Sequence, residues 1–279
     1  GSVLAAIFPF LLTWFGLQNT APKGVVPPSV RWAFYIGAIL LICTSALTMT
    51  HVKEYDPETY AKYHGIKESD NKEGGNWVEL LKHAPKAFWT VSLVQFFCWF
   101  AFQYLWTYSA GAIAQNVWHT TNASSAAYQA AGNWYGVMAA VQSIAAVVWS
   151  YVLAKLPNKY HKAGYMGSLL LGAVGFATVC FFSNQYALIL SYALVGIGWA
   201  GISTYPLTIV TNALSGKHMG TYLGLFNCSI CLPQIVASLC SFFLYPMLGN
   251  SQPHMLLLGG IVMAIGAFSV NAIKETFAA

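Results

Sequence analysis

Long stretches of this chain contain no charged side chain. No Asp, Glu, Lys or Arg occurs between Lys86 and Lys155, between Lys162 and Lys217, or between Lys217 and Lys274. Each stretch is long enough for two membrane-spanning helices of about 20 residues. Only 8% of the 279 residues are charged, against about 25% in ordinary soluble domains. This excludes a soluble enzyme, a disordered tail, a coiled coil and a nucleic-acid-binding protein, and it indicates an integral membrane protein.

The uncharged stretches predict an all-α polytopic fold. Strands of a membrane barrel alternate polar and apolar residues, and runs such as Met166–Phe182 do not alternate. We therefore expect eight transmembrane helices. Their predicted boundaries are Val3–Gly16, Trp32–His51, Ala87–Ile113, Ala127–Ala154, Gly164–Phe182, Tyr186–Val210, Met219–Met247 and His254–Ile273.

The positions of the basic residues predict the topology. If the loop between Val52 and Lys86 is cytoplasmic, eleven of the thirteen Lys and Arg residues lie inside, and only Lys23 and Arg31 lie outside. This follows the positive-inside rule. It places residues 53–86 and the C-terminus in the cytoplasm beneath a plasma membrane, the inner membrane in a bacterium. The net charge of +5 then reflects lysines beside anionic lipid, although lysines solvated in loops are compatible with the same pattern.

One charged loop divides the chain. Residues 53–86 hold six of the thirteen basic and seven of the eight acidic residues. We expect the last two helices of an N-terminal half in residues 1–52, a cytoplasmic linker with a short surface helix near Trp77–His83, and a six-helix half in residues 87–279. This is the pattern of one half of a two-half transporter. The first helix begins at residue 1, so we expect that its start is missing, a native N-terminus being the alternative.

The third predicted helix carries a stripe of amides and indoles. Gln95, Trp99, Phe102 and Trp106 follow i, i+4, i+7, i+11, and Gln103 lies at the edge of the same face. Polar groups at membrane depth are costly and are expected to face the bundle interior or a water-filled cavity. Amides donate and accept hydrogen bonds to hydroxyls, and flat rings can stack on a sugar. The stripe predicts a binding site for a neutral polyol, helix–helix contacts being the alternative.

Three other predicted helices supply further candidate binding residues. One of them, Asn133, could equally be a residue at a helix end whose hydrogen bonds are already made. Asn227 and Gln234 are seven residues apart and share a face. The remaining candidates complete the set: Gln142 with Asn133 on the fourth helix, and Trp199 and Ser203 on the sixth.

Prolines and glycines in these helices predict kinks and close packing. Pro233 precedes Gln234 and removes one backbone hydrogen bond, which fits either a ligand-binding break or a packing kink. Small residues allow another helix to approach closely. The glycines concerned are Gly196, Gly198 and Gly201 in the sixth helix and Gly220 and Gly224 in the seventh.

The predicted spans contain no charged residue. Cation and anion pathways carry rings of charge, and an intramembrane enzyme needs a Ser/His, paired-Asp or metal constellation that is not present at depth. Cys228 and Cys231 have CxxC spacing but no second pair of ligands. We therefore expect no enzyme activity, no cofactor and no metal, and a substrate that is uncharged and rich in hydroxyls.

Several segments resemble a known family. Met219–Asn227 followed by Leu232–Ile235 resembles the eleventh-helix signature of sucrose- and maltose-type transporters, in the glycoside–pentoside–hexuronide branch of the major facilitator superfamily. Gly196–Pro206 is similar to the preceding helix in that group, and Gln95–Phe100 to its seventh helix. The first two predicted helices, with Val26–Val30 between them, resemble helices five and six.

The resemblance implies a fold of twelve helices in two halves, of which this chain holds helices 5–12. It also implies alternating access, proton-coupled uptake of a di- or oligosaccharide, and a monomer. The proton-coupling charges are expected mainly in the N-terminal half, outside this chain. Lys159 and Lys162 take the place of the basic loop between helices eight and nine, where lysine would clamp a gate less strongly than arginine. Pro206, together with Pro233, Gly220 and Gly224, is assigned to gating or packing.

Two other functions remain open for a chain of this kind. One is transport of another neutral solute, by a drug exporter or a nucleoside carrier, in which the cavity would be more apolar and poorer in amides. The other is a non-transporting membrane sensor built on the same fold.

Overall fold

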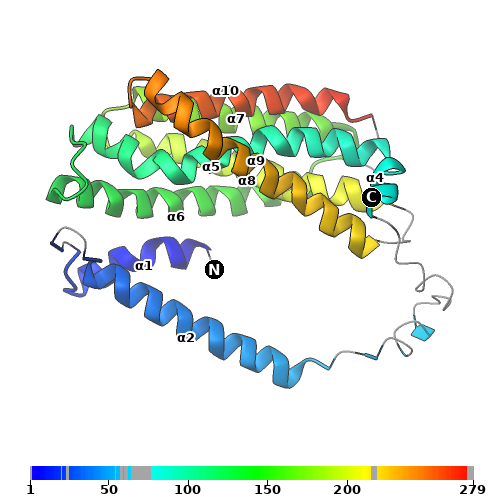
Figure 1. Ribbon diagram of the computed structural model, residues 1–279, viewed down its shortest axis with the longest axis horizontal. Coiled ribbons are helices and arrows are strands. Elements are labelled where there is room, and N and C mark those ends of the chain that lie inside the picture. Colours follow the sequence, from blue (N-terminus) through cyan, green and yellow to red (C-terminus); the bar gives the residue numbers. More distant parts are fainter. Residues whose placement is uncertain are drawn as a thin grey trace.

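The part of the chain that the structure describes folds into helices (Figure 1). The computed structural model describes residues 2–19, 21–22, 25–53, 55–56, 59, 62–63, 77–214 and 219–274, and within these it contains no strand. The helices are α1 (Ser2–Trp14), α2 (Pro28–His51), α4 (Trp77–Lys82), α5 (Lys86–Val117), α6 (Ala126–Ala154), α7 (His161–Phe181), α8 (Leu188–Ala213), α9 (Met219–Met247) and α10 (Gln252–Ser269), with short 3-10 turns η2 (Asn158–Tyr160) and η3 (Val270–Ala272).

The predicted all-α polytopic fold is confirmed. Each of the eight predicted helices is present, and Met219–Met247 has the predicted boundaries. Seven helices in the described part of the chain are long and apolar enough to cross a membrane. The first helix is the exception, because α1 has only 13 residues and a span needs about 20. The expected short helix is also present, as α4, and its place at the membrane surface stays a prediction. Most of the loop before it lies outside the described residues, together with Lys23 and Lys217.

Local signals set the helix ends. Ser125 caps α6 by accepting a hydrogen bond from the Tyr128 amide at 3.2 Å. Ser251 caps α10 in the same way through the His254 amide. Between α9 and α10, Gly249 and Asn250 adopt positive φ angles of 71° and 55°, the left-handed conformation that ends many helices. This tight turn brings α10 back along the bundle.

Helices α5 to α10 form one bundle, in which α10 packs against α5 and α7, α8 against α7 and α6, and α9 against α5. Its core is built from apolar side chains such as Phe102, Leu105, Phe176 and Met263, all fully buried. Helix α1 lies alongside α6, and α2 runs away from the bundle (Figure 1).

Glycines allow the closest helix contacts. A Cβ atom added at Gly198 of α8 would lie 3.0 Å from the Cα atom of Gly172 on α7. At Gly201 it would lie 2.9 Å from the Ser168 Cβ atom, and at Gly196 it would clash with the backbone of α6 at Gln142. The predicted close approach at these three glycines of α8 is confirmed. By contrast, nothing in the described part of the chain lies within 4 Å of such an atom at Gly220 or Gly224, so packing there stays a prediction.

Candidate functional site

The predicted stripe on α5 runs from the core to the surface. The Gln95 side chain is 2% exposed, Phe102 is fully buried, Trp99 is half-buried, and Trp106 is 42% exposed. A stripe that faced lipid would be exposed along its whole length. The burial of its deeper members therefore shows that this face of α5 points into the bundle and reaches the surface only near Trp106.

Trp199 of α8 joins this stripe. Its ring centroid lies 5.6 Å from that of Trp99, 5.9 Å from that of Trp106 and 5.0 Å from that of Phe102. Trp99 and Trp106 are themselves 6.0 Å apart. We call Trp99, Phe102, Trp106 and Trp199 the aromatic cluster. Such ring pairs contribute about 0.5–1.5 kcal/mol each beyond their buried area, so the cluster fixes the contact between α5 and α8.

Five buried polar atoms of α5 lack a hydrogen-bond partner among the described residues, and three of the five lie between Ser92 and Trp99, on one face of the helix. These three are the Gln95 Oε1, Trp99 Nε1 and Ser92 Oγ atoms. An unsatisfied buried polar atom costs about 1–3 kcal/mol, so a hydrogen-bond partner for this acceptor, donor and hydroxyl would stabilise the protein. Sequence reasoning missed Ser92, although its spacing of i, i+3, i+7 with Gln95 and Trp99 places it on the same helix face.

Other amides are already used within the protein. The Gln103 amide donates to the Ser238 Oγ atom at 3.3 Å, and Ser238 in turn donates to the Gln234 carbonyl at 2.8 Å. The Gln234 amide itself donates to the Ile230 carbonyl in its own helix at 3.1 Å. Gln103 therefore links α5 to α9, which is the helix–helix role that the sequence left open.

Helix α9 passes through Pro233 without interruption and buries this proline. This continuity favours the packing kink over a ligand-binding break. Asn227 is exposed, and within the described residues no hydrogen bond links it to the aromatic cluster. The structure thus brings together Trp99 and Trp106 of α5 and Trp199 of α8. Among the described residues it does not join Asn227 to them.

The remaining candidates lie apart. Asn133 and Gln142 are half-buried on α6, and Ser203 is exposed on α8. Pro206 is buried inside α8. No ring contact or hydrogen bond to the aromatic cluster places them in one site, so their roles as binding or gating residues stay predictions.

The two lysines of the predicted gate have different surroundings. The Lys162 ammonium donates to the backbone carbonyls of Asn271, at 3.1 Å, and Ile273, at 2.7 Å. A cation there satisfies carbonyls that the end of a helix leaves without partners. Lys159 lies over the Tyr160 ring at 4.7 Å. Lys162 is thus engaged at the end of η3 in the same bundle, and the gating role of both lysines stays a prediction.

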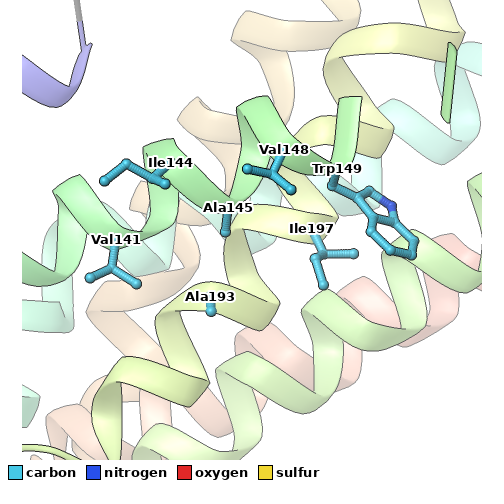
Figure 2. A pocket seen from close by; sticks show the side chains of 7 residues that line it. All are labelled: Val141, Ile144, Ala145, Val148, Trp149, Ala193 and Ile197. Carbon is cyan, nitrogen blue, oxygen red and sulfur yellow. The ribbon is translucent and has the colours of Figure 1, made fainter. Parts of the chain in front are cut away.

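A pocket that the sequence did not indicate lies between α6 and α8 (Figure 2). Its volume is about 350 Å³. It is lined by Val141, Ile144, Ala145, Val148 and Trp149 of α6 and by Ala193 and Ile197 of α8. None of the predicted binding residues lines it. At about 100° per residue, Ala193 and Ile197 lie about 120° and 160° around α8 from Trp199, so the pocket and the aromatic cluster occupy different faces of this helix.

Comparison with known proteins agrees with this architecture. The model of the Major Facilitator Superfamily matches residues 1–238. No curated protein matches the chain. The family match covers α1 to α8 and most of α9, including the aromatic cluster and both helices of the apolar pocket. The chain therefore belongs to the Major Facilitator Superfamily, a family of membrane transporters.

Proposed function

We propose that the protein transports a neutral di- or oligosaccharide of the sucrose or maltose type, by alternating access. The observation that carries this proposal is the aromatic cluster on α5 and α8, together with the Gln95 Oε1 and Trp99 Nε1 atoms, which have no hydrogen-bond partner among the described residues. A sugar hydroxyl both donates and accepts hydrogen bonds, so one hydroxyl can satisfy these two atoms. The exposed ring of Trp106 offers a flat surface for the sugar ring.

The charge distribution supports a neutral substrate. Between Lys86 and Lys155 the sequence contains no charged residue, so no charged side chain at membrane depth in α5 or α6 can pair with a charged solute. A charged solute without a partner at membrane depth would cost several kcal/mol. Coupling to a proton is part of the same proposal, and it rests on the resemblance to sugar/proton symporters alone. Its titratable residue is expected in the N-terminal half of such a transporter.

We also propose the topology that the lysines indicate. Residues 53–86 and the C-terminus lie in the cytoplasm of a plasma membrane, and residues 87–279 form one half of the transporter. The packing of α5 to α10 into one bundle supports this division. Labelling of cysteines introduced at Asn184, in the α7–α8 loop, and at Lys159 tests the topology. Only the thiol at position 159 should be protected in intact cells.

Uptake by reconstituted protein tests the transport proposal. Labelled sucrose or maltose should accumulate in proteoliposomes only when a pH gradient is imposed. Replacing Trp99 by Phe keeps a ring but removes the indole N–H, and Gln95→Leu removes the amide; each should weaken uptake about tenfold, the effect of one lost hydrogen bond. Trp89→Phe is the matched control, because Trp89 is 52% exposed on the same helix and should leave uptake unchanged.

The same assay separates the competing functions. If the protein is an exporter of apolar solutes, Trp99→Phe retains the ring surface and should leave transport intact. Accumulation of no glycoside, with or without a gradient, contradicts sugar transport altogether.

A further inference from the structure

The apolar pocket lies between α6 and α8 (Figure 2). The side chains of Ile144 and Val148 on its rim are 51% and 60% exposed. Trp199 points from α8 to α5 on a different face of the helix. The pocket therefore faces the surroundings of this bundle and does not face the α5–α8 contact.

The lining of the pocket offers no hydrogen bond to a ligand. Six of its seven side chains are aliphatic. The seventh, Trp149, already donates its indole N–H to the Ser168 Oγ atom at 2.8 Å, and Ser168 donates in turn to the Gly164 carbonyl. A polar occupant would lose its hydrogen bonds with water without replacement, so the occupant that fits is a hydrocarbon chain.

The depth of the pocket matches one leaflet of a bilayer. Along α6, Trp149 and Val141 lie about 9 Å and about 21 Å from Lys155, at about 1.5 Å per residue. With Lys155 at headgroup level, the middle of the bilayer lies about 21 Å away from it, beyond an interfacial layer of about 6 Å and half of a hydrocarbon core of about 30 Å. Val141 therefore lies at a depth close to the middle of the bilayer. An acyl chain from the leaflet on the side of Lys155 can therefore reach along the whole pocket.

A lysine, Lys155, lies beyond the Trp149 end of this pocket. Lys155 directly follows α6, and its ammonium lies 4.3 Å from the centre of the Tyr151 ring. The sequence contains no Asp or Glu between Glu79 and Glu275, so no carboxylate of the α6–α8 region can neutralise Lys155. The complementary group is the phosphate of an anionic lipid headgroup, which has no quaternary ammonium to offset its charge.

We infer that the seam between α6 and α8 binds an anionic phospholipid. One acyl chain occupies the pocket between Val141 and Trp149, and the phosphate headgroup pairs with Lys155. The site is separate from the proposed sugar site, and its occupancy does not depend on which solute the protein carries.

Native mass spectrometry of the purified full chain tests this inference. The protein is titrated with phosphatidylglycerol and with phosphatidylcholine of the same acyl chains. Phosphatidylglycerol should bind about fivefold more tightly, the effect of one lysine near an anionic headgroup. Lys155→Gln should abolish this preference. Lys82→Gln, at an exposed lysine on α4, is the matched control and should retain it.

Two further substitutions test whether an acyl chain occupies the pocket. Ala193→Phe fills the pocket, and Val148→Phe places a ring at its exposed rim, where folding is not at risk. Each should weaken binding of both lipids about tenfold, the effect of displacing about two methylene groups. Val174→Phe, at a position 50% exposed on α7, should change nothing.

Three outcomes overturn the inference. They are equal affinity for the two lipids, undiminished phosphatidylglycerol binding by both phenylalanine variants, and a disulfide between Val148→Cys and Ile39→Cys in nanodiscs. The last would mean that α2 covers the pocket instead of lipid.

Discussion

Replacing Gly175 by alanine should push α7 away from α8. A Cβ atom at this position would lie 2.6 Å from the Ser191 carbonyl oxygen, 2.7 Å from the Val195 nitrogen and 2.9 Å from the Leu194 Cβ atom. Two of these are backbone atoms of α8, which cannot turn aside as a flexible side chain can. The shortest contact is about 0.8 Å below the 3.4 Å at which ordinary van der Waals contact begins. The two helices must therefore separate.

The expected cost follows from two opposing effects. Overpacking in a core costs about 1–3 kcal/mol, whereas alanine gains up to about 1 kcal/mol over glycine in a helix. Gly167→Ala on the same helix isolates the second effect, because nothing lies within 4 Å of a Cβ atom there. The difference between the two variants then measures overpacking alone, and we expect Gly175→Ala to be about 2 kcal/mol less stable than Gly167→Ala.

Unfolding in mixed detergent–SDS micelles measures this difference. A gap of about 2 kcal/mol corresponds to about 4–8 °C in Tm for a chain of this size. If Gly175→Ala is as stable as Gly167→Ala, then α7 and α8 are not in contact at Gly175, and the close helix approach through glycines would be refuted.

Three further substitutions should have smaller effects. Lys162→Met removes two hydrogen bonds to the carbonyls at the end of η3 and should lower the unfolding free energy by about 1–2 kcal/mol, whereas Lys159→Met should have little effect. Tyr222→Phe removes the hydrogen bond from the Tyr222 hydroxyl to the Leu80 carbonyl, 3.1 Å long, and should speed amide exchange in α4. Ser125→Ala removes the cap of α6 and should cost about 1 kcal/mol, measured by the same unfolding assay.

The positions of the helices could be predicted because the charges are so unevenly spread. Lys86 and Lys155 bracket α5 and α6 closely, and Lys162 lies in the first turn of α7. A charge in the hydrocarbon core is costly, so these three lysines mark helix ends in the sequence. No charged residue marks the end of α1 before Lys23, yet the predicted Val3–Gly16 lies within two residues of the observed Ser2–Trp14 at each end.

The candidate site could be predicted only in part. Periodicity places Gln95, Trp99 and Trp106 on one face of α5, and the structure keeps them on one face. The periodicity of the sequence cannot predict which helix this face meets, because that depends on how α8 approaches α5. The glycines of α8 indicated a close contact without naming its partner, and the partners proved to be α7 and α6.

Hydrogen bonding within the protein explains why Gln234 of α9 and Gln103 of α5 did not join the aromatic cluster. An amide within a helix can bond to a carbonyl one turn back, as Gln234 does with Ile230, and this satisfies it without any second helix. Gln103 likewise bonds to Ser238. Residue type alone shows that a side chain can bind a hydroxyl, but not whether the protein has already used it. The Gln95 Oε1 and Trp99 Nε1 atoms differ, because these buried atoms have no hydrogen-bond partner among the described residues.

Helix α8 presents two chemically different faces. Trp199 on one face meets the rings of α5, whereas Ala193 and Ile197 on another line a pocket without a free donor or acceptor. A polar solute would lose hydrogen bonds in the pocket, while a hydrocarbon chain would leave Gln95 and Trp99 unsatisfied beside the cluster. The two faces therefore select opposite ligands, so substitutions at Ala193 should affect lipid binding without the loss of sugar uptake expected from substitutions at Trp99.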